Sequence, residues 1–146
     1  MSETPLPTVL AISDIHEGMV VSEELLFSEL DIKEFARLSG DYNPLHTNAE
    51  FARDRGFDGA VVHGALIISK ISKIIGMRLP GCNSVWTSLN LTFERPLIAG
   101  RRASLTATVA FVSEAASIVD LAIEVRSDNI RLAKGKAEVV VRRLGA

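Results

Sequence analysis

The chain has 146 residues, of which 47% are apolar and 23% are charged, and its net charge is −2. These values fit one globular domain with a core of its own and exclude a disordered chain. No basic run is longer than two arginines, which argues against a nucleic-acid partner, and a single cysteine excludes an internal disulfide.

The first residues do not read as an export signal, because no basic stretch precedes a long apolar run. Lysines interrupt the longest apolar stretch before it reaches the length of a membrane span. We therefore expect a cytoplasmic protein without membrane contact. Residues 1–18 contain two prolines and little periodicity, so we interpret them as an irregular lead-in to a single domain over residues 19–146.

The first half of the domain predicts a strand followed by short helices. Residues 19–30 are rich in Val, Leu and Phe and favour a strand. Asp31 and Glu34 have the spacing of a capping box, which predicts a helix that begins at Asp31 and ends at Gly40. Asn48 is placed to cap a second short helix over residues 48–55, closed by Gly56.

The clearest helix is predicted over residues 65–77, where isoleucines recur on one broad face. Ser69, Ser72 and Gly76 share a narrow face of small residues, and Lys70 and Lys73 point in a third direction. The plain interpretation is a half-buried helix with a solvated lysine edge. The sharper one is that the small face lies against a ligand or a partner backbone.

The second half of the chain changes to strand patterns, over residues 85–93, 103–112, 117–125 and 130–141. Short turns, including the hairpin signal Ser127–Asp128–Asn129, join these strands in sequence. Consecutive strands with short turns favour an antiparallel sheet. One helix packed on such a sheet gives an α+β fold.

The segment "SGDYNPLH" places the carboxylate of Asp41 five residues before the imidazole of His46. Held near one water, such a pair can polarise it and move its proton, since imidazole titrates near neutral pH. The Asn43–Pro44 turn between them is suited to fixing their geometry. The alternative is that Asp41 only stabilises the turn and His46 is a structural or surface histidine; spacing alone leaves both open.

A second candidate segment is His63–Gly64, just before the central helix. Gly64 permits close approach to the backbone, and free N–H groups at a helix start can stabilise an oxyanion. For His63 we favour a role in fixing the loop by hydrogen bonds. The sequence contains no motif for a serine or cysteine nucleophile and no phosphate-binding loop, which disfavours covalent catalysis and nucleotide binding.

The segments "SGDYNPLH", "AEFARDRGFDGAVVHGALIISKISKIIG", "LPG" and "FERPLIAG" together resemble the MaoC-like dehydratase family, which includes the (R)-specific enoyl-CoA hydratases. The resemblance runs from about residue 31 to residue 101. It implies a hot-dog fold, in which a curved antiparallel sheet wraps a long central helix. It also implies homodimers, paired sheet edge to sheet edge, or larger homo-oligomers.

The resemblance also implies a site. The family's catalytic pair falls on Asp41 and His46, its supporting serine on Ser72, and the glycine whose amide binds the thioester oxygen on Gly64. We include Asn43 and His63 among the substrate-binding residues, and we expect the pocket beside the Ser69, Ser72 and Gly76 face. The implied reaction is reversible hydration of trans-2-enoyl thioesters of CoA or acyl carrier protein, with no metal or redox cofactor.

Two alternatives share this fold: an acyl-CoA thioesterase and a module that binds acyl thioesters without turnover. The intact Asp41 and His46 element favours hydration. The sequence departs from the family pattern at Asn48, where many members have aspartate, and at Lys70 and Lys73, where the helix is commonly more apolar. The lysines could stay solvated, contact a partner subunit or narrow the acyl tunnel.

Overall fold

The structure is a computed structural model, and it describes residues 2–142. A 3₁₀ turn, Ile12–Asp14, precedes the first strand. The elements then follow in the order β1 (Val20–Leu25), α1 (Glu29–Ser39), α2 (Pro44–Thr47), α3 (Ala49–Asp54), α4 (Gly64–Met77), β2 (Ser84–Phe93), β3 (Ala103–Ser113), β4 (Ile118–Ser127) and β5 (Ile130–Val141).

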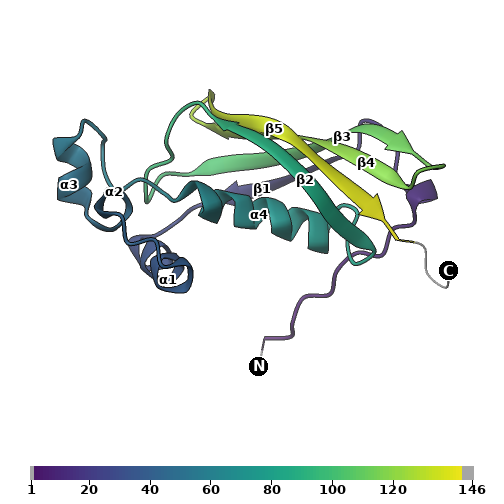
Figure 1. Cartoon of the computed structure of the whole chain (residues 1–146), viewed down its shortest axis with the longest axis horizontal. Coiled ribbons are helices and arrows are strands. Elements are labelled where there is room, and N and C mark those ends of the chain that lie inside the picture. The colour runs from purple at the N-terminus through teal and green to yellow at the C-terminus, as the bar shows by residue number, and fades with distance from the viewer. Residues whose placement is uncertain (1, 143–146) are drawn as a thin grey trace.

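All five strands form one antiparallel sheet in the order β1-β3-β4-β5-β2. The sheet curves along one side of α4, while α1, α2 and α3 gather beyond the amino-terminal end of that helix (Figure 1). Alternate residues of β3, β4 and β5 are buried, as expected for strands with one face on the core. The α+β prediction is therefore confirmed.

The start of α1 corrects the sequence prediction. Ser28 is the N-cap: its hydroxyl accepts from the Asp31 N–H at 3.1 Å, while the Asp31 carboxylate accepts from the Ser28 N–H at 2.8 Å. Asp31 thus occupies the third helical position of the capping box rather than the cap itself. The helix begins earlier than predicted because serine at the N-cap completes the reciprocal pair, and this shortens the preceding strand.

The predicted ends of the short helices are confirmed. Gly40 closes α1 in the left-handed conformation, with φ of 80°. Asn48 caps α3, because its side-chain oxygen accepts from the Phe51 N–H at 3.0 Å. Between these two points the sequence predicted only a turn at Asn43–Pro44, whereas Asn43 caps the short helix α2 and Pro44 is its first residue. Proline suits that position because it has no N–H to leave unpaired and its fixed φ fits a helix.

The central helix α4 buries Ile67, Ile71, Ile74 and Ile75 against the sheet. Lys73 on its lysine edge is exposed, as the plain interpretation expects, and Lys70 is half-buried; both also contact neighbouring segments. Lys73 forms an ion pair with Glu23 of β1, and the Lys70 ammonium lies 5.8 Å from the centre of the Phe27 ring.

Within residues 1–18, the segment that precedes β1 packs on the domain. The Thr8 N–H donates to the Met77 carbonyl at the end of α4, and the Thr8 carbonyl accepts from the Cys82 N–H, both at 2.9 Å. Ile12 and Ile15 are buried in the same core as α4. None of the described helices is long and apolar enough to cross a bilayer.

Candidate active site

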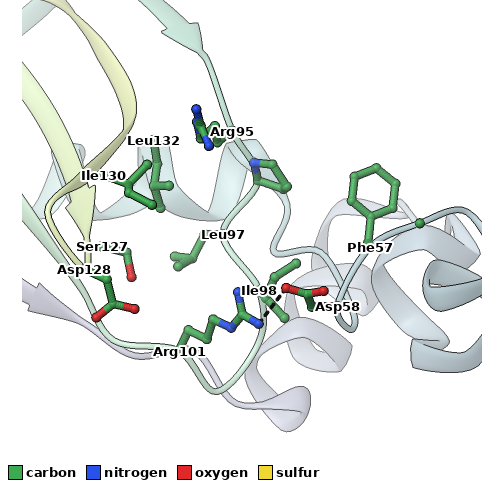
Figure 2. A pocket seen from close by; sticks show the side chains of 12 residues that line it. Phe57, Asp58, Arg95, Leu97, Ile98, Arg101, Ser127, Asp128, Ile130 and Leu132 are labelled. Atoms are coloured by element: carbon green, nitrogen blue, oxygen red, sulfur yellow. Dashed lines mark hydrogen bonds and ion pairs between the residues drawn. The ribbon is translucent and has the colours of Figure 1, made fainter.

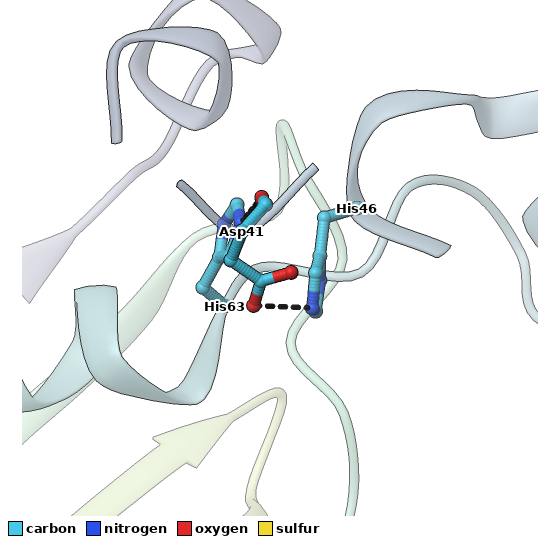
Figure 3. A group of neighbouring side chains, drawn as sticks. All are labelled: Asp41, His46 and His63. Atoms are coloured by element: carbon cyan, nitrogen blue, oxygen red, sulfur yellow. Dashed lines mark hydrogen bonds and ion pairs between the residues drawn. The ribbon is translucent and has the colours of Figure 1, made fainter. Parts of the chain in front are cut away.

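The Asp41 carboxylate has two distinct neighbours. Its Oδ1 accepts from the Asn43 N–H at 3.1 Å, which closes the turn, and its Oδ2 lies 3.8 Å from Nε2 of His46 (Figure 3). The structural role and the candidate catalytic role of Asp41 therefore coexist on different oxygens. The Asp41 side chain is 51% exposed, so solvent reaches it directly.

His46 lies on α2 and is held by a backbone carbonyl. Its Nδ1 is 2.7 Å from the Val61 oxygen. A carbonyl can only accept, so Nδ1 carries the proton and Nε2 of the neutral ring is left with a lone pair. That lone pair is the group next to Asp41. The loop that contains Val61 is itself fixed, because the Val61 N–H donates to the Leu45 carbonyl at 3.0 Å.

The separation of 3.8 Å between Oδ2 and Nε2 is too long for a direct hydrogen bond. It is short enough for one water to hydrogen-bond to both atoms at about 2.8 Å. Asp41 and His46 therefore lie close enough to share one water.

His46 lines a cavity of about 310 Å³ at the start of α4. Apolar side chains dominate the walls, and α4 contributes Gly64 and Ile67. As the first residue of α4, Gly64 has an N–H without an acceptor inside the helix. The Phe93 ring packs over Gly64 so closely that a Cβ there would lie 2.9 Å from the ring. The site thus combines an apolar wall, an imidazole and a helix-start amide.

A second cavity, of about 300 Å³, shares Phe57, Arg95, Pro96 and Leu97 with the first. Figure 2 shows Arg101 of this cavity in an ion pair with Asp58, at 2.8 Å. The two cavities adjoin along the connection between β2 and β3. Together they offer room for an extended ligand that passes Arg95.

Three predicted substrate-binding residues, Asn43, His63 and Ser72, lie outside the described lining of the His46 cavity, and so does Asp41. The Asn43 side-chain oxygen accepts from the Leu45 N–H at 3.0 Å and caps α2. Ser72 is exposed on α4, two turns beyond Gly64. The His46 cavity therefore opens at the start of the helix, where Gly64 and Ile67 are the α4 residues that line it. Ser69 of the small-residue face lines a separate cavity, together with Leu66 and Lys70.

His63 completes a cluster of three side chains whose candidate ligand atoms lie within 4.8 Å of one another, the others being Asp41 and His46. The two imidazoles are stacked, with centroids 3.9 Å apart and planes 24° apart. An imidazole binds a metal in the plane of its ring. Because the two rings lie face to face, one ion cannot lie in both ring planes at coordination distance, so the stacking disfavours a shared metal.

Two contacts of the site were not predicted from the sequence. The carbonyl of Val61 sets the His46 tautomer, but a backbone acceptor has no side-chain signature. Phe93 covers Gly64 from the end of β2, and only its place in the "FERP" segment of the family resemblance hinted at a role. Both contacts join segments that are far apart in the sequence.

Comparison with known proteins gives a family model described as "MaoC like domain", which matches residues 12–129. A relative from Rhodospirillum rubrum, named (R)-specific enoyl-CoA hydratase, is 38% identical over 96 residues, which cover 66% of this chain and 67% of that protein. A mitochondrial 3-hydroxyacyl-[acyl-carrier-protein] dehydratase of Arabidopsis thaliana is 42% identical over 83 residues, covering 57% of this chain and 49% of that protein.

Among solved structures, the (R)-hydratase of A. caviae matches with a TM-score of 0.83 and 28% sequence identity. The match covers 87% of this chain and 97% of that one. The hot-dog fold expected from the sequence is thereby confirmed.

Proposed function

Because the chain belongs to the MaoC-like domain family, we propose that it is a hydro-lyase of the (R)-specific enoyl-CoA hydratase type. It would add water reversibly to trans-2-enoyl thioesters and form (R)-3-hydroxyacyl thioesters. The observation that carries the proposal is the separation of 3.8 Å between Asp41 Oδ2 and His46 Nε2, with His46 lining an apolar cavity. The relatives named as hydratases and dehydratases support it.

In the proposed reaction, a water held between Asp41 and His46 adds its oxygen to C3 of the enoyl group. Nε2 of His46 takes one proton from that water, and Asp41 in its protonated form delivers one proton to C2. Transfer of the proton from His46 to Asp41 then restores the starting state of the pair. The Gly64 N–H would stabilise the negative charge that develops on the thioester oxygen. Thioester activation makes a metal or redox cofactor unnecessary.

The proposed partners are a thioester substrate and a second copy of the chain. Acyl-CoA and acyl-carrier-protein thioesters are both candidates, because relatives are named for each. For the homodimer we propose pairing along β2, which has ten residues and lies at one edge of the sheet, whereas the opposite edge strand, β1, has six. We also propose a cytoplasmic location, which cell fractionation would test.

The proposal predicts that Asp41→Asn and His46→Gln abolish most of the hydration of crotonyl-CoA, followed by the loss of enone absorbance. Each change removes a group that moves a proton, and such groups contribute about 100- to 10,000-fold to rate. Asn at position 41 keeps an oxygen that can close the turn, so the fold should be retained. Glu50→Gln, an exposed change on α3, is the control and should keep full activity.

If the wild type hydrates neither crotonyl-CoA nor longer enoyl thioesters of CoA or acyl carrier protein, the hydratase proposal is wrong. A thioesterase would instead release free thiol from saturated acyl-CoA, which a thiol reagent detects. Tight acyl-CoA binding with neither reaction would identify a binding module. The stereochemistry of the product, determined by chiral chromatography, should be (R).

A further inference from the structure

Within the described residues 2–142, His63 is the one polar or charged residue that is buried, with 1% of its surface exposed. Both of its chain neighbours, Val62 and Gly64, line the cavity that contains His46, but His63 does not. Its ring lies behind the site rather than in it. A direct contact with substrate is therefore not what this geometry supports.

The His63 ring instead contacts both members of the candidate pair (Figure 3). Its Nε2 lies 3.1 Å from the backbone carbonyl of Asp41. Its face stacks on His46, with centroids 3.9 Å apart. The Phe35 ring of α1 packs edge-on against it at 4.9 Å and holds it from another direction.

These contacts define the hydrogen positions on His63. Nε2 faces a carbonyl oxygen, so it carries the proton and donates. Nδ1 is then an acceptor, and in the described structure it is buried without a hydrogen-bond partner. A buried acceptor without a partner destabilises the fold, and an apolar ring would avoid that cost. Stability alone therefore does not explain a histidine at this position.

We propose that His63 is a positioning residue, which sets the distance between Asp41 and His46 by holding the backbone of one and the ring of the other. The inference rests on the proposed hydratase function and adds a residue to it that acts only through the pair. Since a displacement of 1 Å in a reacting group can lower a rate about 100-fold, control over a separation of 3.8 Å matters to the rate.

Three substitutions separate the two contacts. His63→Phe keeps a ring that can stack on His46 but loses the donor to Asp41. His63→Gln keeps an N–H near the position of Nε2 but loses the ring. His63→Leu loses both. We expect kcat to fall in each, most in the leucine variant at about 100-fold, while KM for the enoyl thioester changes little because substrate contacts are kept.

The melting temperature distinguishes positioning from a structural role. His63→Phe removes the unpartnered buried nitrogen, so it should melt at the wild-type temperature or higher while kcat falls. Phe27→Leu, a buried core change away from the pair, is the matched control and should lower the melting temperature with wild-type kcat. Wild-type kcat in His63→Phe and His63→Leu, or a fall that matches the loss of folded protein, would overturn the proposal.

A measurement that does not depend on catalysis separates the positioning role of His63 from the proposed hydratase activity. The chain has three histidines, so the His46 ring signals in NMR spectra can be assigned from the variants. We expect these signals to shift in His63→Gln and His63→Leu, where the stack is lost, even if the wild type hydrates no thioester. Unchanged His46 signals in both would overturn the positioning role, whereas an inactive wild type with shifted signals would overturn only the proposed reaction.

Discussion

At the scale of single residues, the site depends on backbone atoms as much as on side chains. The Val61 carbonyl sets the tautomer of His46, and the Asp41 carbonyl sets that of His63. Each carbonyl forces a proton onto the nitrogen it faces, and so leaves the other nitrogen as an acceptor. The consequence is that His46 presents a lone pair toward Asp41, and no second carboxylate is needed to orient the ring.

Gly64 gives a prediction at the same scale. A Cβ at this position would meet the Phe93 ring at 2.9 Å, and Phe93 is 45% exposed and can move away. Gly64→Ala should therefore fold but displace Phe93 and disturb the cavity. We expect hydration to fall about 10- to 100-fold in steady-state assays.

Gly76→Ala is the control for that change, because it makes the same substitution in the same helix where nothing lies within 4 Å of the new methyl group. It should raise stability by about 0.5–1 kcal/mol and leave the rate unchanged, since alanine favours a helix interior over glycine. Equal rates in the two variants would show that the contact between Gly64 and Phe93 has no part in the reaction.

At the scale of elements, α4 is held by more than its isoleucine face. Lys73 pairs with Glu23 of β1, and the residue 8 backbone binds the carboxyl end of the helix. The Glu23 side chain is only 15% exposed, and its Oε2 is buried without a hydrogen-bond partner in the described structure. Lys73, which departs from the family pattern, therefore supplies the positive charge that pairs with the Glu23 carboxylate.

Lys73→Met should lower the free energy of unfolding by about 1–3 kcal/mol, because it leaves the Glu23 carboxylate without its cation. Urea denaturation followed by circular dichroism measures this. Arg102→Met breaks the exposed pair with Glu24 and should cost at most about 1 kcal/mol. The double variant Glu23→Gln with Lys73→Met should recover part of the loss; no recovery would mean that the lysine stabilises the helix in another way.

At the scale of the whole molecule, the site forms where three distant segments meet. The segment from Asp41 to His46, the loop that leads from Val61 into α4, and the end of β2 converge at one end of the central helix (Figure 1). The sheet order leaves β2 at one edge and β1 at the other. The described chain thus presents a long edge strand on the side of the sheet to which Phe93 belongs.

The proposed homodimer predicts a particle of twice the chain mass of 15.8 kDa in light scattering after size exclusion. An edge strand of ten residues has unpaired backbone groups along its outer side, and a second copy would satisfy them. The measurement should be repeated over a range of protein concentrations in the micromolar region. A constant mass of 15.8 kDa across that range would contradict the pairing.

Much of the fold could be predicted from local patterns. Gly40 and Asn48 ended and capped helices as predicted, because Gly40 acts through its own backbone and Asn48 through a side-chain contact three residues away. The predicted start of α1 at Asp31 was wrong, because the N-cap is Ser28. Both residues suit an N-cap, and only the folded backbone shows which one takes that position. The ion pair of Lys73 could not be predicted, because its partner Glu23 lies fifty residues away, on strand β1.

The sequence by itself determined the α+β class, the central helix and, through the family resemblance, the identities of Asp41, His46 and Gly64 as a candidate site. These follow from periodicity, turn chemistry and motif, all of which act over a few residues. Only the tertiary structure decided that His63 lies behind the pair, that Phe93 covers Gly64 and that the cavity opens at the start of α4. Those features depend on contacts between segments far apart in the chain, and local preference does not fix such contacts.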